Sequence, residues 1–262
     1  MECTAETSES KEATQQRPHA DALYAEICRD TCVRSLNITC SPLLDRYTDV
    51  GTLERTRVNL STGEYINANH VHLLDRHFIL GQAPVRHAFA TFWRTIWEHD
   101  CAEIVMLTSL VESNVEKADC YWPVNSDAPL CVEEFRVELK RVYEREPGLL
   151  VRELLLRQGR AERAVTLFQD MRWIDHGCPA HEIIAPLLRA VDERRLDSAP
   201  IFVHCSAGIG RSGVFTILCA LFSKPRPISV ESLCQTIKSL RQQRAGAVQN
   251  CAQFQFLLNY LT

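Results

Sequence analysis

The sequence predicts a domain of the α/β (α+β) class, and three features lead to this prediction. Residues 201–203 are apolar, as in a buried strand, and a glycine-containing loop joins them to an apolar helix at about residues 212–222. Residues 104–108 form a continuous apolar run, which is typical of a central strand buried on both faces. Between residues 131 and 170 apolar and polar residues alternate around turns, as they do in antiparallel strands.

Length, charge and polarity limit what kind of protein this is. The chain has 262 residues, enough for one large domain with a substantial core, which we expect to span residues 19–262. The net charge of −4 gives no sign of nucleic-acid binding, and no apolar run is long enough to cross a bilayer. The first residues are polar, unlike a secretory signal. We therefore expect a cytoplasmic monomer that contacts neither nucleic acid nor membrane.

The 12 cysteines and 9 histidines raise the question of disulfides and metals. Because we see no secretory signal, we expect reduced thiols, and no C-x-x-C pair occurs. Cys28 and Cys32 can share one helix face, where we interpret them as buried thiols rather than metal ligands. No histidine pair combines zinc-type spacing with a partner motif. The sequence therefore predicts no metal and no cofactor.

The first part of the chain contains two expected helices. Residues 1–18 are rich in Ser, Thr, Glu and Gln without an apolar period, so we expect a flexible segment there. A helix is expected from about Ala20, with Leu23 and Ile27 facing inward. A later helix carries apolar side chains on or near one face, which predicts that they enter the core: Phe89, Phe92, Trp93, Ile96 and Trp97.

Strands and helices follow one another in the second part of the chain. Turns at 147–148 and 158–159 divide the antiparallel region into hairpins. A helix is expected from about residue 180 to 195, before the strand of residues 201–203. Ser229 is a candidate N-cap for the next helix, and Asn250 with Gln253 fits the capping pattern of a last one.

The loop after residues 201–203 carries the chemistry. Gly208 and Gly210 allow positive φ angles, which turn successive N–H groups inward. The positive end of the following helix adds to this cradle for a dianion, and Arg211 adds a two-pronged grip on phosphate oxygens. In that field the Cys205 thiol should ionise at neutral pH and act as a nucleophile. Each feature alone also fits a structural loop or a core cysteine, but together they favour phosphoryl transfer.

The run His204 to Gly213, H-C-S-A-G-I-G-R-S-G, resembles the signature of the tyrosine-specific protein tyrosine phosphatases. The resemblance covers most of the chain and implies a highly twisted mixed β-sheet flanked by helices. It implies hydrolysis of phosphotyrosine in proteins through a phosphocysteine on Cys205. It also implies that Ser212 hydrogen-bonds the leaving thiolate and that His204 holds Cys205. The phosphate would be bound by Arg211 and by loop amides, among them those of Ser206, Ala207, Gly208, Ile209 and Gly210.

The same resemblance implies a wall for the substrate. Tyr47 matches a tyrosine that lines the phosphotyrosine cleft, and Asp49 matches an aspartate that hydrogen-bonds the substrate backbone. An aromatic wall can stack on the phenyl ring and set the depth of the cleft. The alternative is a surface tyrosine and a turn-capping aspartate. Leu44 and Asp45 replace the usual Lys-Asn of the family, a change that bears on substrate preference.

Three further side chains have supporting or catalytic roles by resemblance. Glu112 matches a glutamate that braces Arg211, although Glu116 is an alternative if the alignment slips. Gln249 matches a glutamine that orients the attacking water, since an amide both donates and accepts hydrogen bonds. Gln253 matches the second glutamine of that motif, but it also fits helix capping alone.

The stretch from Phe168 to Pro179 resembles the mobile W-P-D loop of the family, with Asp175 as the general acid. A phenolate leaves poorly unless it is protonated as the P–O bond breaks. Trp173 and Gly177 would be hinge and anchor. Ile174 replaces the family proline, which should change loop closure rather than chemistry. Asp175 could instead be a helix-end carboxylate, a turn residue, or a remnant in a binding-only protein.

Three other functions remain open at this point. A phosphotyrosine-binding protein without turnover is suggested by Ile174 and by the altered glutamine-proline segment at residues 81–84. A dual-specificity or lipid phosphatase would need a shallower cleft than Tyr47 allows. A scaffold without an anion site would gain no thermal stability from vanadate or phosphate.

Overall fold

The computed structural model describes residues 8–32, 37–173, 177–194 and 199–262. Its main sheet has eight strands: β3 (Ala68–Leu73), β4 (Arg76–Gly81), β5 (Glu103–Met106), β8 (Leu130–Val132), β9 (Phe135–Glu146), β10 (Leu149–Gln158), β11 (Ala161–Asp170) and β12 (Ile201–His204). Two short pairs join β1 (Ile38–Thr39) to β2 (Thr52–Leu53) and β6 (Val111–Glu112) to β7 (Val115–Glu116). The helices are α1 (Ser8–Asp30), η2 (Glu54–Thr56), η3 (Arg86–Ala88), α2 (Phe89–Glu98), α3 (His181–Asp192), α4 (Arg211–Ala220), α5 (Val230–Gln243) and α6 (Cys251–Leu261).

The main sheet is mixed, which confirms the predicted fold class. Its strand order is β3-β4-β12-β5-β11-β10-β9-β8. Strands β4, β12, β5 and β11 run parallel, whereas β3 and the hairpins β8 to β10 pair antiparallel. Every residue of β5 and β12 is buried, as expected for central strands covered on both faces. The carboxyl end of β12 therefore lies at the middle of the sheet edge, where α/β folds bind ligands.

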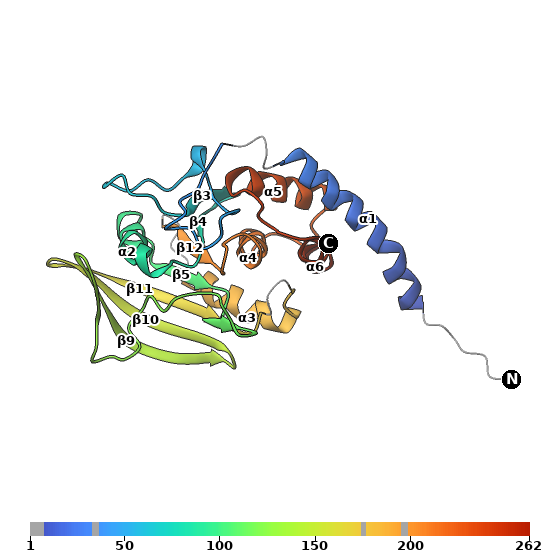
Figure 1. Ribbon diagram of the computed structural model, residues 1–262. Coiled ribbons are helices and arrows are strands. Elements are labelled where there is room, and N and C mark those ends of the chain that lie inside the picture. The colour runs from blue at the N-terminus through green and yellow to red at the C-terminus, as the bar shows by residue number, and fades with distance from the viewer. Residues whose placement is uncertain (1–7, 33–36, 174–176, 195–198) are drawn as a thin grey trace.

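Helices cover both faces of the parallel strands and create two cores. On one face α4 packs against β12 and β4, while α3, α5 and α6 surround it and α1 lies against α5 and α6 (Figure 1). On the other face α2 brings Phe92 and Trp93 together with Tyr121, and Phe92 packs edge-on against Phe202 of β12. The strand that precedes the glycine loop is thus held from above and below.

Helix ends follow the expected capping residues. The Ser229 hydroxyl accepts a hydrogen bond from the N–H of Ser232 at the start of α5. The Asn250 side chain accepts from the N–H of Gln253 at the start of α6. Helix α1 differs from expectation, because it begins at Ser8 rather than near Ala20.

The interpretation of Cys28 and Cys32 as buried thiols is wrong for Cys32, which is exposed, while Cys28 is half-buried. The buried residues are instead Ile27 in α1 and Thr31 just after it, one position earlier in each case. Within the described ranges, no helix is both long enough and apolar enough to cross a membrane.

Candidate active site

The loop between β12 and α4 has the conformation of an anion cradle. Gly208 has φ +71°, and a Cβ there would lie 1.9 Å from the carbonyl oxygen of Gly81, so only glycine fits. Gly210, expected to share that conformation, has φ −76° instead. What it needs is space, because a Cβ at Gly210 would lie 3.0 Å from Oε1 of Gln249. One glycine therefore turns the loop, and the other lets an amide side chain approach it.

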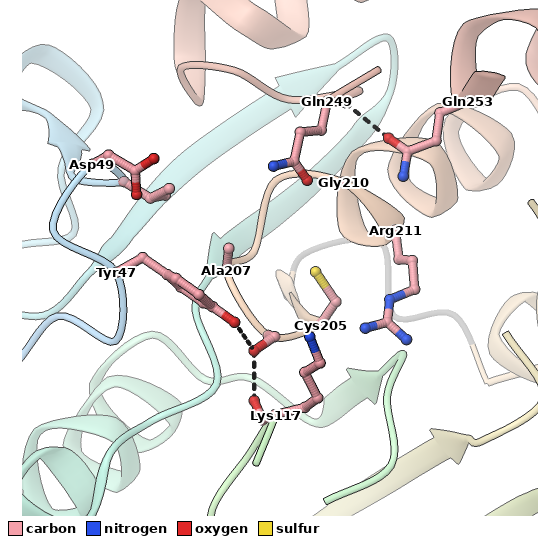
Figure 2. A pocket seen from close by; sticks show the side chains of 11 residues that line it. Tyr47, Asp49, Lys117, Cys205, Ala207, Gly210, Arg211, Gln249 and Gln253 are labelled. Atoms are coloured by element: carbon pink, nitrogen blue, oxygen red, sulfur yellow. Dashed lines mark hydrogen bonds between the residues drawn. The ribbon is translucent and has the colours of Figure 1, made fainter. Parts of the chain in front are cut away.

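A cavity of about 170 Å³ opens over this loop (Figure 2). It brings together segments that are far apart in the sequence. Nine of the predicted site residues line it: Tyr47, Asp49, Cys205, Ser206, Ala207, Gly210, Arg211, Gln249 and Gln253. Lys117 also lines the cavity, although we assigned it no role from the sequence. The position of Lys117 in a charged loop did not indicate a site residue, because only the tertiary structure brings it next to the cradle.

Cys205 is buried at the base of the cavity, with 5% of its surface exposed. Burial raises the pKa of its thiol, but the Arg211 guanidinium and hydrogen bonds from Ser212 and the Gly208 amide outweigh that effect. The net result is a pKa below the ordinary value, which favours the thiolate. Both the side chain and the backbone of Ser212 contribute to this lowering, and the Ser212 hydroxyl is itself buried.

Arg211 is oriented by Glu112 from β6. Its Nη1 lies 2.7 Å from Oε1 of Glu112, and its Nη2 lies 3.2 Å from Oε2. Only 2% of the Arg211 side chain is exposed, so the pair fixes the guanidinium plane inside the protein. Glu116, the alternative considered from the sequence, is exposed on β7. The structure therefore brings Glu112 to the arginine.

Tyr47 forms one wall of the cavity and is tied to the loop (Figure 2). The Tyr47 hydroxyl lies 2.8 Å from Oγ of Ser206. The Ser206 hydroxyl in turn donates a hydrogen bond to the carbonyl of Lys117 at 2.7 Å. These bonds hold the half-buried ring beside the cradle rather than free on the surface. Asp49 lies nearby on the exposed rim of the same wall.

Comparison with known proteins agrees with this geometry. Residues 42–262 match the sequence profile described as protein-tyrosine phosphatase. The chain belongs to the protein-tyrosine phosphatase family. Tyrosine-protein phosphatase 2 of Schizosaccharomyces pombe is 34% identical over 245 residues, which cover 86% of this chain and 34% of that protein. The mouse tyrosine-protein phosphatase non-receptor type 20 is 30% identical over 219 residues, or 81% of this chain and 51% of that protein.

Solved structures of tyrosine phosphatases have the same fold. The catalytic domain of human protein tyrosine phosphatase non-receptor type 18 aligns with a TM-score of 0.84 at 25% identity, covering 95% of this chain and 98% of that one. The Trypanosoma cruzi phosphatase TcPTP1 aligns with a TM-score of 0.87 at 26% identity, covering 95% of this chain and 90% of that one. This chain spans much less of the two sequence relatives above, 34% and 51% of their lengths.

His204 of this phosphatase domain is a satisfied buried histidine. Its Nδ1 lies 2.9 Å from the carbonyl oxygen of Cys205, and its Nε2 lies 2.7 Å from the hydroxyl of Tyr121. Burial lowers the pKa of His204 to about 4, although the hydrogen bond with Cys205 opposes the change. The ring is therefore neutral at physiological pH, and it holds the backbone of Cys205 between β12 and the loop.

Arg244 is a supporting residue of this phosphatase domain that sequence reasoning missed. Its buried guanidinium donates to the carbonyls of Ala207 and Gly208 at 3.1 and 3.2 Å. It also donates to the side chains of Asn67 and Asn69 at 2.8 and 2.9 Å. The sequence did offer a signal for this role, because Arg244 belongs to the same motif as Gln249.

The two glutamines of the phosphatase domain lie side by side at the cavity (Figure 2). The backbone N–H of Gln249 donates to Oε1 of Gln253 at 2.8 Å, which leaves the Gln249 side chain at the cavity. Gln253 is buried. The carbonyl of Ile209 accepts a hydrogen bond from Val248, so the cradle and the glutamine loop are directly joined. Ile209 itself is buried and is not among the residues that line the cavity.

Asp175, which the resemblance implies as the general acid, and Ile174 lie outside the described residues. The residues on both sides of them are described. Trp173 is buried, and its Nε1 donates to the carbonyl of Gly177 at 3.0 Å. Its own carbonyl accepts a hydrogen bond from Arg211 at 2.9 Å. Trp173, before the segment that carries Asp175, is thereby bonded to the arginine of the cradle, and Gly177, after that segment, is bonded to Trp173.

Proposed function

We propose that this domain hydrolyses phosphotyrosine in proteins to tyrosine and phosphate. The observation that carries the proposal is the pairing of Cys205, whose thiol pKa is lowered, with the braced guanidinium of Arg211 in one small cavity. Few reactions other than phosphoryl transfer need a nucleophile next to a phosphate-binding group. A phosphatase of the same fold, PTPN18, has been solved with HER2 phosphopeptides, which supports peptide-borne phosphate as the substrate class.

In the first step the Cys205 thiolate attacks phosphorus in line with the tyrosyl oxygen. The S–P bond forms while the P–O bond to the phenol breaks, and Asp175 delivers the proton that the phenolate needs. Arg211 and the N–H groups of residues 206–211 hold the three equatorial oxygens, whose charge is stabilised without reorganisation of solvent. Glu112 supports this step by holding the guanidinium in one plane.

In the second step water displaces the sulfur from phosphorus. Asp175, now a carboxylate, takes the proton from water, and the side chain of Gln249 orients that water at the cavity. The thiolate of Cys205 leaves and is stabilised by Ser212 and Arg211. Inorganic phosphate is released and Asp175 is again protonated, so the enzyme returns to its starting state.

Tyr47 and Asp49 supply preference for tyrosine. The ring of Tyr47 walls the cavity, so a phosphate on a short seryl side chain should reach the cradle poorly, whereas a phenyl ring bridges that depth. Asp49 at the rim is placed to accept hydrogen bonds from substrate backbone N–H groups. We therefore predict that phosphotyrosine peptides are hydrolysed much faster than matched phosphoserine peptides.

The decisive assay is phosphate release from a phosphotyrosine peptide by the wild type beside Cys205→Ser. We expect multiple turnover by the wild type and none by the variant, with a labelled phosphocysteine trapped only in the wild type. Peptide binding without release in both proteins would identify a phosphotyrosine-binding protein instead. Equal rates on phosphoserine peptides would contradict the assigned specificity.

A further inference from the structure

Val248, the residue before Gln249, has a strained backbone with a φ angle of +57°. Among the non-glycine residues with positive φ in the part of the chain that the structure describes, Val248 alone is β-branched. A branched side chain makes this left-handed conformation costly, and the Val248 side chain is also fully buried. Such strain persists only where surrounding contacts hold it, and it clusters at functional sites. The contacts that hold Val248 therefore indicate what the strain serves.

Both polar groups of the Val248 backbone are bonded to other segments. Its N–H donates to the carbonyl of Ile209 in the cradle at 3.0 Å. Its carbonyl accepts two hydrogen bonds, from the Tyr24 hydroxyl at 2.9 Å and from Nη1 of Arg241 at 3.2 Å. Val248 is therefore held between the cradle on one side and the helices α1 and α5 on the other.

Tyr24 is the contact that comes from α1, the helix that lies against α5 and α6 (Figure 1). The half-buried ring of Tyr24 stacks on Phe254 of α6, with 5.8 Å between the ring centroids. Burial raises the pKa of the Tyr24 hydroxyl above its ordinary value, so the group stays protonated and remains a donor. Tyr24 precedes residues 42–262, which match the family profile, and none of the motifs described above includes it.

The bond from Tyr24 acts on the peptide unit that joins Val248 to Gln249. The oxygen of this unit is the Val248 carbonyl, and its nitrogen is the Gln249 N–H, which donates to Oε1 of Gln253 at 2.8 Å. Because a peptide unit is planar, holding both its oxygen and its nitrogen fixes its orientation. That orientation sets the direction in which the Gln249 side chain leaves the backbone toward the cavity.

We propose that Tyr24 is a positioning residue for the second step of the reaction and acts through Val248 on Gln249. This inference rests on the proposed function, in which Gln249 orients the attacking water. In that step the P–O bond to water forms as the S–P bond breaks, and Asp175 takes the proton. Without the hydroxyl, the Val248 carbonyl keeps only the bond from Arg241, so the Gln249 amide is held less firmly. The first step uses no water and does not depend on Tyr24.

Rapid-quench measurement of phosphocysteine tests this inference, because it follows the two steps separately. The full chain is mixed with a radiolabelled phosphotyrosine peptide, and Tyr24→Phe removes only the hydroxyl. We expect the decay of phosphocysteine to slow by about three- to tenfold, the effect of losing one neutral hydrogen bond. Its formation rate should stay unchanged, which also shows that the variant is folded. The matched control Tyr143→Phe changes a half-buried tyrosine on β9 and should alter neither rate.

A double-variant comparison tests whether Tyr24 acts through Gln249. In a Gln249→Ala background, Tyr24→Phe should slow the decay no further, because the group that it positions is absent. Equal slowing in both backgrounds, or an unchanged decay in Tyr24→Phe beside a reacting wild type, would overturn this inference alone. Slower formation of phosphocysteine in Tyr24→Phe would show a general structural role and would also overturn it. A wild type that forms no phosphocysteine would contradict the proposed function, and this inference with it.

Discussion

Glu112 and Arg211 form a two-point ion pair at the edge of the cradle, with N–O distances of 2.7 and 3.2 Å. The pair joins the short β6–β7 hairpin to the first residue of α4 across 99 positions of sequence. Because the arginine is buried and its carboxylate partner nearly so, the guanidinium is held in one orientation before substrate arrives. Phosphate then meets a fork that already points into the cavity.

Glu112→Gln should weaken catalysis through this orientation. The amide keeps the shape of the side chain but loses the charge that fixes the guanidinium. We expect kcat/KM on a phosphotyrosine peptide to fall by about ten- to a hundredfold, the usual effect of losing an orienting contact. The matched control is Glu116→Gln on the exposed partner strand, which should leave kcat/KM unchanged. Equal losses in both variants would show that hairpin charge, not the ion pair, matters.

Gly208→Ala should prevent the cradle from forming. Its Cβ would overlap the Gly81 carbonyl at 1.9 Å and the Gln82 nitrogen at 2.8 Å, and both belong to the backbone. We expect a loss of about 4 kcal/mol or more in unfolding free energy, measured by urea denaturation. Gly159→Ala is the control, because Gly159 also has a positive φ of +58° but has open space around it. Its unfolding free energy should fall only by the cost of a left-handed backbone at alanine, about 1–2 kcal/mol. Similar losses would refute the steric argument.

Arg244→Met should destabilise the domain, because five oxygen acceptors would lose the donor that this buried guanidinium supplies. We expect unfolding free energy to fall by at least about 3 kcal/mol in denaturant titrations. Arg86→Met, which changes a largely exposed arginine, should stay within about 0.5 kcal/mol of the wild type. If Arg244→Met kept full stability and activity, the cradle would not depend on this arginine.

The cradle was predictable because its determinants are contiguous. Strand, loop glycines, cysteine and arginine all lie between residues 201 and 211, so local rules of strand, turn and helix apply. The sheet order and the pairing of Glu112 with Arg211 needed the resemblance, because periodicity does not say which segments meet. Gly210 shows the limit of the local rule: its role is space beside Gln249, which depends on a loop 39 positions later.

Contacts that depend only on tertiary structure were not predicted. Arg244, the C-cap of α5, reaches Asn67 just before β3 and Asn69 within it, more than 170 positions earlier. Lys117 lines the cavity after the β6–β7 hairpin, where its carbonyl accepts a hydrogen bond from Ser206 of the loop. The contacts of His72 with His77 and of His70 with His99 likewise arise from the register of β3 with β4 and from the end of α2. None of these juxtapositions has a signature in residue spacing.

Asp175→Ala should separate binding from turnover. Loss of the general acid leaves the cradle intact, so substrate affinity should be kept while kcat falls by about 10²–10⁴-fold. The measurement pairs steady-state kinetics with phosphopeptide binding to the variant. The kcat on p-nitrophenyl phosphate, whose leaving group needs no proton, should fall much less. Parallel loss of affinity would show that Asp175 is structural.

Cys205 should react as a thiolate at a lower pH than ordinary thiols do. Burial raises its pKa, and Arg211 with the Ser212 and Gly208 hydrogen bonds lowers it further than burial raises it. The reactive form is present above the lowered pKa, so alkylation by iodoacetamide should slow only as pH falls through that value, below the ~8.5 of a free thiol. Mass spectrometry of the alkylated peptide identifies the site, and phosphate or vanadate should protect it.

Arg211→Met tests the cause of that shift. Without the guanidinium the burial effect is opposed only by hydrogen bonds, so the alkylation midpoint of Cys205 should move to higher pH. Cys101 provides an internal reference, because burial raises its pKa and no cation opposes this, so it should stay unreactive throughout. An unchanged midpoint in Arg211→Met would mean that the loop amides alone ionise the sulfur, and the arginine would then act on phosphate only.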